Sequence, residues 1–362
     1  MIHEMRKSAL ITGATGQDGY YLVKLLLKKN YELTLLVRDN SRRSKTTLFE
    51  DLELTDEEIA RTKVSPGDLL DESSIKHALA ESSPAEVYNL AAQSHVGYSF
   101  EAPCYTAEVN ALGPLKLLEA IRTSGRREDI KFYQASTSEL YGKVQEIPQT
   151  ENTRFYPRSP YGVAKLFAFW ITVNYREAFG MFACNGILFN HESPRRGLNF
   201  VTRKITFSLA RIFKGADEIL ELGNLDALRD WGHARDYVEM QWLMLQQPEP
   251  RDFVIATGRQ ATVRDFVLLA AESLGVTIEF SGSGLGEVGI VSAISPDSPA
   301  LKRLIGRVIL RVNPRFYRPA EVETLLGSPI KANELLGWVP ATTLAQLAEE
   351  MMQHDFRRAE SY

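Results

Sequence analysis

The sequence predicts an α/β fold with a doubly wound parallel sheet and a smaller mixed α/β lobe. In the first half of the chain, apolar runs of strand length alternate with helical patterns. These runs lack the polar alternation of a half-exposed strand, as expected where helices cover both faces of a sheet. The length of 362 residues allows one large domain or two modest ones.

Each element of the first half is predicted from its hydrophobic pattern. The expected strands are residues 8–12, 32–37, 86–90, 131–135 and 182–188, with another directly before Gly67. The expected helices are residues 20–29, 73–81, 105–123 and 160–179.

After about residue 190 the pattern becomes that of the smaller lobe. The expected elements are a loop at 194–197, a basic amphipathic helix at 201–213, a strand at 252–257, a helix at 262–274 capped by Thr262, a Gly-rich connection at 281–287 that is mobile or faces a partner, a short strand at 308–312 and a helix at 344–354. We expect one domain from residues 1–190 and roughly 233–258, and the lobe from residues 191–232 and 259–362.

Composition excludes several classes of protein. The net charge of −4 and the lack of a Lys or Arg block argue against a nucleic-acid surface. No apolar run approaches the ~20 residues of a membrane span, and polar residues 1–7 lead directly into a strand, so we expect neither a membrane segment nor a signal peptide. Two distant cysteines indicate a reducing, cytoplasmic setting, and six scattered histidines predict no metal site. Packing roles are expected for Cys104, Cys184, Trp170 and Trp231.

A Gly-x-x-Gly-x-x-Gly motif joins the first strand to the first helix. Gly13 allows a tight turn, Gly16 lets a pyrophosphate approach the main chain, and Gly19 allows the helix to pack closely on the strand. The helix N-terminus that follows favours phosphate groups. An ordinary Gly-rich turn could have this spacing, but the flanking strand and helix favour dinucleotide binding.

The end of the second strand bears on the identity of the cofactor. Nicotinamide folds often carry an acid there that binds the ribose 2′-hydroxyl, whereas this chain has Val37 followed by Arg38. A missing carboxylate beside a cation favours a 2′-phosphate and hence NADP. Asp39 favours NAD if its side chain points toward the ribose. Alternatively, the charges of Arg38 and Asp39 are only solvated loop charges.

After the third strand, Asp68 is placed to accept a hydrogen bond from an adenine amine. Small residues in 90–94 allow close approach of the cofactor or tight helix packing.

A candidate catalytic group follows the fifth strand. Tyr161 and Lys165 are four positions apart on an expected helix, so they share a face. A nearby ammonium lowers the pKa of a phenol, which can then act as a base. The spacing alone is weak, but Thr137 and Glu139 end a neighbouring strand and should reach the same cleft. A carboxylate there adds a second base, which permits removal of a proton α to a ketone followed by β-elimination. In the alternative, non-catalytic interpretation, the Thr137 hydroxyl only stabilises a turn, and Glu139 is an acidic residue on the surface of a helix or turn.

Five longer strings resemble one known family. They are residues 134–142, 155–161, 186–197, 229–237 and 317–322, and they are similar to the GDP-mannose 4,6-dehydratase family of the extended short-chain dehydrogenase/reductase superfamily. The likeness runs from about residue 8 to residue 355 and implies a Rossmann-type doubly wound parallel sheet with a smaller substrate lobe.

The resemblance implies a redox-neutral reaction with tightly held NADP. Tyr161, supported by Lys165 and Thr137, would take the proton of the sugar 4-hydroxyl while hydride leaves C4. Glu139 would then remove the C5 proton and help the C6 hydroxyl leave as water. Hydride would return to C6 and a proton to C5, giving GDP-4-dehydro-6-deoxy-mannose.

The resemblance also implies the binding residues. The cofactor positions are Gly13, Thr15, Gly16, Gln17, Asp18, Gly19, Arg38, Asp68, Leu69, Leu90, Ala91, Ala92, Gln93, Ser94, Tyr105, Lys165, His191 and Arg196. The nucleotide-sugar positions are Ser94, Glu139, Tyr161, Asn190, Lys204, Arg229, Arg318 and Glu321. Arg and Lys suit a diphosphate, and a carboxylate can accept from guanine N–H groups. Alternatively, Arg229 pairs with Asp230 or Asp236, and His191 only orders Arg195 or Arg196.

Some segments depart from the family pattern. The family often has Arg-Arg where this chain has Arg38-Asp39, and residues 40–62 and 288–307 match poorly. Family members use the first of these loops to reach a neighbouring subunit's cofactor site. The resemblance therefore implies a homo-oligomer, and the departure in this loop leaves dimer and tetramer open. Rival functions are a GDP-manno-heptose 4,6-dehydratase, an NADPH-dependent nucleotide-sugar reductase or epimerase, and a non-catalytic cofactor-binding scaffold. Glu139 argues against a plain reductase, and the intact catalytic set argues against a scaffold.

Overall fold

The chain forms two compact units in the computed structural model, which describes residues 6–38, 44–316, 322 and 324–360. Unit 1 comprises the described residues of Met1–Phe189, Ala234–Ile255 and Gly327–Val339. Unit 2 comprises those of Asn190–His233, Ala256–Leu326 and Pro340–Tyr362. The expected lobe therefore differs from unit 2 at Gly327–Val339. That segment belongs to unit 1 because Ala332 and Trp338 are buried in its core, where the Trp338 Nε1 donates to the Asp236 carbonyl at 3.1 Å.

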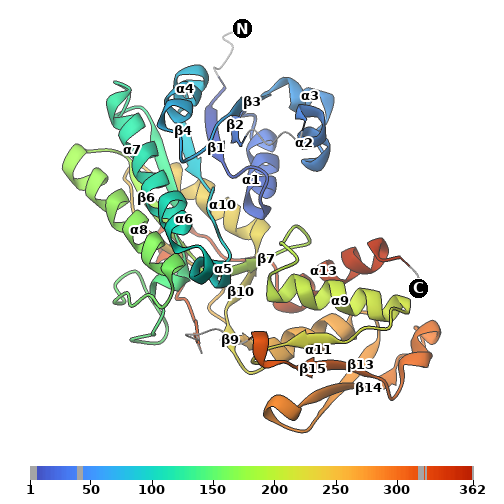
Figure 1. Ribbon diagram of the computed structural model, residues 1–362. Coiled ribbons are helices and arrows are strands. Elements are labelled where there is room, and N and C mark those ends of the chain that lie inside the picture. The colour runs from blue at the N-terminus through green and yellow to red at the C-terminus, as the bar shows by residue number, and fades with distance from the viewer. Residues whose placement is uncertain (1–5, 39–43, 317–321, 323, 361–362) are drawn as a thin grey trace. The chain divides into compact units, whose positions relative to one another are not determined.

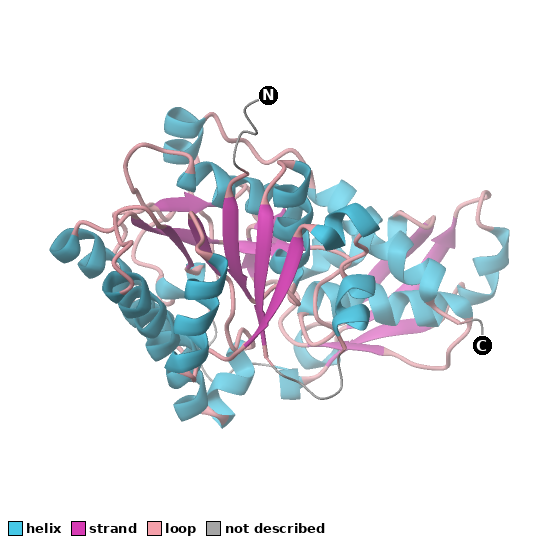
Figure 2. Cartoon of the chain, turned by 90° about the horizontal axis from the view of Figure 1, so that it is seen from above, coloured by secondary structure: helices cyan, strands magenta, loops and turns pink. Residues whose placement is uncertain are grey.

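A parallel sheet of seven described strands forms the centre of unit 1 (Figure 2). The strand order is that of a Rossmann-type fold, and its direction reverses between β1 and β4, where the chain returns from β3 to the other side of β1. In spatial order the strands are β11 (Phe253–Ile255), β6 (Ala183–Leu188), β5 (Lys131–Ala135), β4 (Glu86–Asn89), β1 (Ser8–Thr12), β2 (Glu32–Val37) and β3 (Thr62–Pro66). The predicted doubly wound sheet is confirmed.

Helices cover both faces of this sheet (Figure 1). Alternate residues of β1 point to opposite layers, since Ile11 packs in the core with α1 and α10 while Leu10 packs in the core with α4 and α7. The helices of unit 1 are α1 (Gln17–Lys28), α2 (Lys45–Asp51), α3 (Asp56–Ala60), α4 (Glu72–Ser82), α5 (Val96–Glu101), α6 (Pro103–Ala107), α7 (Gly113–Thr123), α8 (Pro160–Phe179), α10 (Ala234–Leu245) and α12 (Ile330–Leu336), with a π-helical stretch η1 (Glu108–Leu112) and a 3₁₀ turn η2 (Ser138–Leu140).

One helix and one loop expected in unit 1 differ from the structure. The single helix expected at 105–123 is three segments, because η1 inserts a π-helical stretch between α6 and α7. In that stretch the buried Asn110 side chain bonds the backbone of Gln93 at both its N–H and its carbonyl, each at 2.8 Å. The poorly matching loop at 40–62 contains α2 and α3, the latter begun by a capping box between Thr55 and Glu58.

Unit 2, in its described part, has two helices that contact a four-stranded sheet and a third helix that packs on those two. Its strands are β13 (Val276–Ser281), β14 (Val288–Ile294), β15 (Val308–Val312) and β8 (Leu220–Leu222) in spatial order, with two small pairs, β7 (Asn190–Glu192) with β10 (Trp231–His233) and β9 (Leu228–Arg229) with β12 (Ala261–Thr262). The helices are α9 (Val201–Lys214), α11 (Val263–Glu272) and α13 (Leu344–Arg358), with 3₁₀ turns at Gly284–Gly286, Pro299–Leu304 and Pro314–Phe316.

The sequence predicted the helices of unit 2 better than its strands. Thr262 caps α11 through a capping box, as expected. The expected strand at 252–257 is shorter and extends the unit 1 sheet as β11. Residues 281–287 connect β13 to β14, two antiparallel strands that the sequence reading missed.

The expected packing roles hold in full for two of the four residues, since Cys184 and Trp231 are buried. Trp170 packs in part: its ring lies 5.2 Å from that of Phe169 and 6.4 Å from that of Phe155, and 55% of the residue is exposed. The prediction for Cys104 was wrong, because this residue is exposed on its helix in unit 1. Apolar character alone does not tell a core face from an uncovered one.

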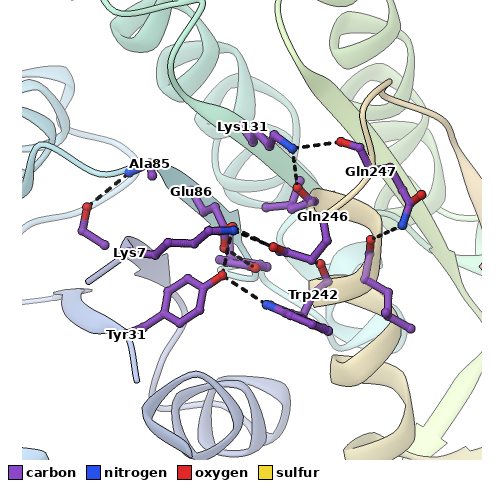
Figure 3. A network of polar contacts seen from close by, with 12 residues as sticks. Lys7, Tyr31, Ala85, Glu86, Lys131, Trp242, Gln246 and Gln247 are labelled. Carbon is purple, nitrogen blue, oxygen red and sulfur yellow. Dashed lines mark hydrogen bonds and ion pairs between the residues drawn. The ribbon is translucent and has the colours of Figure 1, made fainter. Parts of the chain in front are cut away.

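The amino end of the unit 1 sheet holds a buried polar network (Figure 3). The carboxylate of Glu86 accepts hydrogen bonds from Tyr31 at 3.0 Å, Tyr88 at 2.8 Å and Gln246 at 3.1 Å. Lys7 lies 3.7 Å from the same carboxylate. A buried carboxylate needs such donors, so this network fixes the end of the sheet opposite the carboxyl ends of its strands.

Candidate active site

The glycine motif forms a tight cradle at the carboxyl end of β1. Gly13 has φ +74°, and a Cβ there would lie 2.7 Å from the Ala91 nitrogen. A Cβ at Gly19 would lie 2.3 Å from the Gly13 oxygen, so α1 can pack on the turn only without one. Gly16 is the N-cap of α1 and has no side chain to bond the first N–H groups of the helix. A pyrophosphate fits this arrangement, because helix N-terminal N–H groups bind it and no Cβ blocks its approach.

Other candidate cofactor residues of unit 1 line up along the same edge of the sheet. Segment 90–94 contacts the glycine turn, and the Arg38 Nη1 donates to the Tyr105 hydroxyl at 3.3 Å. Asp68 follows β3 and accepts a hydrogen bond from the Leu70 N–H at 2.9 Å. Asp39, which bears on NADP against NAD, lies outside the described residues.

Tyr161 and Lys165 lie in the first turns of α8. Ser159 caps this helix by accepting from the Gly162 N–H at 3.0 Å, which fixes the position of its first turn. The Lys165 Nζ lies 6.0 Å from the centre of the Tyr161 ring and donates to the Ala135 carbonyl at 2.9 Å. Burial lowers the pKa of Lys165 to about 8, although the carboxylate of Asp18 raises it in part.

Thr137 and Glu139 lie directly beside this turn of α8. The Thr137 Oγ1 accepts from the Glu139 N–H at 3.2 Å and caps η2. A Cβ at Gly162 would lie 2.9 Å from the Glu139 carbonyl oxygen, so α8 packs against the backbone of Glu139. Glu139 is only 9% exposed. The alternative in which it is a surface acid was therefore wrong, and the structure brings all four candidate catalytic residues together in unit 1.

Sequence reasoning missed a buried side-chain network beneath this group. Thr12 donates to Asn89 at 2.7 Å, Asn89 donates to Gln134 at 2.8 Å, and Gln134 donates at 2.9 Å to the Ala135 carbonyl that also accepts from Lys165. The sequence feature that could have indicated this network is that each of these polar residues ends or nearly ends an otherwise apolar strand.

Ser136 was missed as well. Its Oγ is buried and has no hydrogen-bond partner among the described residues, one position before Thr137. An orphaned hydroxyl of this kind suits a contact with a ligand.

The candidate residues in unit 2 lie near its start. Asn190 and His191 belong to β7, and the buried Asn190 Oδ1 has no hydrogen-bond partner within the described chain. The Arg196 Nε lies 3.0 Å from the Glu192 carboxylate without forming a hydrogen bond, and its guanidinium carbon lies 3.6 Å from the centre of the Phe200 ring. These buried polar atoms suit contacts with a bound nucleotide.

Lys204 and Arg229 are further candidates in unit 2. The Lys204 Nζ lies 3.2 Å from the centre of the Phe316 ring, and burial lowers its pKa to about 8. Arg229 is 8% exposed and donates to the Leu228 carbonyl at 2.9 Å. Asp230, one of the expected partners of Arg229, accepts from Thr257 and Gly258. Arg318 and Glu321 lie outside the described residues.

The described residues contain neither a metal-binding cluster nor a membrane-spanning helix. No group of three or more His, Cys, Asp or Glu side chains there could hold a metal ion. No helix in the same residues is long and apolar enough to cross a membrane.

Comparison with known proteins identifies the family. Residues 10–351 match the family model described as GDP-mannose 4,6 dehydratase. The GDP-mannose 4,6-dehydratase of Yersinia enterocolitica is 56% identical over 356 residues, which cover 98% of this chain and 95% of that protein. The chain belongs to the GDP-mannose 4,6-dehydratase family. The family likeness extends to eukaryotes, since GDP-mannose 4,6 dehydratase 2 of Caenorhabditis elegans is 53% identical over 98% of this chain and 91% of its own length.

Solved structures of low sequence identity share the fold. A dTDP-glucose 4,6-dehydratase of Streptomyces venezuelae, solved with NAD, superposes with a TM-score of 0.77 at 20% identity and covers 97% of both chains. RMD of Pseudomonas aeruginosa, solved with NADPH, gives a TM-score of 0.73 at 22% identity, covering 97% of this chain and all of that chain. Both confirm the Rossmann-type fold.

Proposed function

We propose that this protein is a GDP-mannose 4,6-dehydratase, a hydro-lyase that forms GDP-4-dehydro-6-deoxy-mannose. Family membership supports the reaction class. The observation that carries the proposal is the burial of Glu139 beside Thr137, in a turn packed against the start of the helix that bears Tyr161 and Lys165. This arrangement supplies two bases to one site, which dehydration requires and simple ketone reduction does not.

Each side chain then has a role that its chemistry permits. Tyr161 takes the proton of the sugar 4-hydroxyl, and the Lys165 ammonium stabilises its phenolate. Thr137 orients the same hydroxyl. Glu139 removes the C5 proton, which the 4-ketone has acidified, and the proton reaches the departing C6 hydroxyl, which leaves as water.

We infer that the cofactor is NADP, held through many turnovers. When bound, it would accept hydride from C4 and return it to C6. The glycine cradle and the Arg38–Tyr105 contact, both in unit 1, support a phosphate-rich ligand. Arg196 stays a cofactor residue that the family resemblance implies. We assign the dinucleotide to a domain built on the unit 1 sheet and the nucleotide sugar to the smaller lobe. Mass spectrometry of the denatured protein should find NADP, and NAD alone would overturn this choice.

The substrate residues form a separate part of the proposal. We infer that Lys204 and Arg229 bind the GDP diphosphate and that Asn190 contacts the ligand through its buried carbonyl oxygen. Arg318 and Glu321 stay candidates from the sequence, as guanosine-binding residues. A diphosphate beside Lys204 would restore its charge at pH values where burial otherwise favours the neutral amine.

We also propose a homo-oligomer. Val163, Phe167 and Trp170 follow one another on a single face of α8 and are 57%, 42% and 55% exposed. An apolar stripe of this kind is typical of a surface that a second copy covers. Dimer and tetramer both fit this stripe. The cytoplasmic location stays a prediction, supported by two free cysteines.

Turnover without reductant tests the proposed function. Purified protein incubated with GDP-mannose should give a 4-keto-6-deoxy product, detected by mass spectrometry, with no net change in NADPH absorbance. Product formation that consumes NADPH in equal amount would contradict it and favour a reductase. Rates with GDP-mannose and GDP-manno-heptose, measured in parallel, decide between the two dehydratase substrates.

A further inference from the structure

A buried ion pair joins the last helix of the chain to the loop that carries Arg196. Arg203 lies on α9 and Asp355 on α13, 152 positions later. The Arg203 Nε lies 2.9 and 2.8 Å from the two Asp355 oxygens, and its Nη2 lies 2.7 Å from Oδ1. The side chains are 12% and 1% exposed. The guanidinium and the carboxylate form a bidentate ion pair, which fixes the orientation of the two side chains relative to each other.

The same guanidinium also bonds the loop at 193–197. Its Nη1 donates to the Pro194 carbonyl and, at 3.1 Å, to the Arg196 carbonyl. Arg203 thereby ties the backbone on both sides of Arg195 to a buried carboxylate. Lysine could not make this set of contacts, because an ammonium lacks the planar array of donors on two faces.

The Arg196 side chain is fixed from the other side of the loop. Its guanidinium lies over the Phe200 ring and beside Glu192, and Glu192 in turn accepts from the Thr202 hydroxyl at 2.5 Å. Backbone and side chain of Arg196 are thus both positioned by α9. The Asp355 carboxylate is held by α9 at a second residue, because it also accepts a hydrogen bond from the Thr206 hydroxyl at 2.6 Å.

We propose that Arg203 and Asp355 are positioning residues for the cofactor site, and that α13 sets the affinity for a nicotinamide dinucleotide phosphate by holding the Arg196 loop. This inference rests on the proposed function, in which Arg196 binds NADP. Neither residue is placed to touch reacting atoms. Their loss should therefore weaken cofactor binding while leaving the rate of the loaded enzyme nearly unchanged.

The test measures NADP affinity by isothermal titration calorimetry on cofactor-stripped protein. Arg203→Lys keeps the charge opposite Asp355 but loses the donors to the two carbonyls. We expect its Kd for NADP to rise about 10-fold or more, with kcat at saturating NADP within about twofold of wild type. The matched control is Arg211→Lys, since Arg211 lies on the same helix and pairs with the more exposed Glu218 at 2.7 Å. The control should keep the wild-type Kd.

A second variant separates positioning from stability. The double variant Arg203→Met/Asp355→Leu replaces the pair by apolar side chains, which commonly preserve or improve stability. We expect thermal melts near wild type with a Kd still raised about 10-fold. A wild-type Kd in Arg203→Lys, or in the folded double variant, would overturn this inference alone. Wild-type protein that fails to bind NADP would overturn the cofactor proposal and this inference with it.

Discussion

At the residue scale, four side chains acquire their proposed roles from their surroundings. Thr137 and Glu139 are held in a buried turn, and Tyr161 and Lys165 in a capped helix start that packs on it. The sequence already paired Tyr161 with Lys165 by spacing. Nothing local showed that Glu139 is buried, because burial depends on contact with α8.

Glu139→Gln tests the second base. The amide keeps the size of the side chain but cannot remove a proton, so dehydration should fall by about 10²- to 10⁴-fold. Binding of GDP-mannose, measured by calorimetry, should change less than about threefold, because the neutral side chain keeps its volume and one carbonyl oxygen. Wild-type turnover in this variant would remove Glu139 from the mechanism.

The lowered pKa of Lys165 predicts an alkaline limit on activity. Burial brings this pKa to about 8, so the ammonium is present below that pH and is lost above it. Rates at saturating GDP-mannose and NADP should therefore decline above pH 8. Asp18→Asn removes a charge that raises this pKa, and the midpoint should move to lower pH. Asp129→Asn, at a surface position, is the control. An unmoved or higher midpoint for Asp18→Asn would refute the assignment.

At the element scale, α8 has two different faces. Its inner face carries Tyr161 and Lys165, both buried, and its outer face carries the stripe of Val163, Phe167 and Trp170. One helix can do both because residues three or four positions apart share a face while the others point away. The sequence reading assigned Trp170 to packing. The structure shows that one side of this ring packs edge-on against Phe155 and Phe169, while 55% of the residue stays exposed.

Charging the outer face of α8 tests the homo-oligomer. Phe167→Glu combined with Trp170→Glu should shift the protein to a smaller assembly in analytical ultracentrifugation, because burying two unpaired like charges opposes association. Thermal stability of the dissociated chain should drop only modestly, since both side chains are exposed. Leu285→Glu, at another exposed apolar position, is the control. An unchanged sedimentation coefficient would place the interface elsewhere.

At the scale of the whole molecule, stability and chemistry draw on different regions. The buried network around Glu86 lies at the amino end of the unit 1 sheet (Figure 3), while the candidate catalytic residues follow the carboxyl ends of its strands. Open parallel sheets bind ligands at their carboxyl edge. The amino edge is therefore available for contacts that serve folding alone.

Glu86→Leu tests this division. It removes the acceptor for Tyr31, Tyr88 and Gln246, so the free energy of unfolding in urea should fall by about 3 kcal/mol. Glu86→Gln keeps an acceptor oxygen and should cost about 1 kcal/mol. Turnover at 25 °C should match wild type in both variants. A loss of activity in folded Glu86→Gln would show that the two ends of the sheet are coupled.

The sequence by itself determined the order of the main elements, the glycine cradle and the spacing of Tyr161 and Lys165, because these depend on local periodicity and on residues close together in the chain. It did not predict the π-helical stretch at Asn110, strands β13 and β14, or the place of Gly327–Val339 in unit 1. Tertiary contacts decide these features. They also decided the burial of Glu139 and the pairing of Arg203 with Asp355 across 152 positions, since only the folded chain shows which polar groups lose water and which partners replace it.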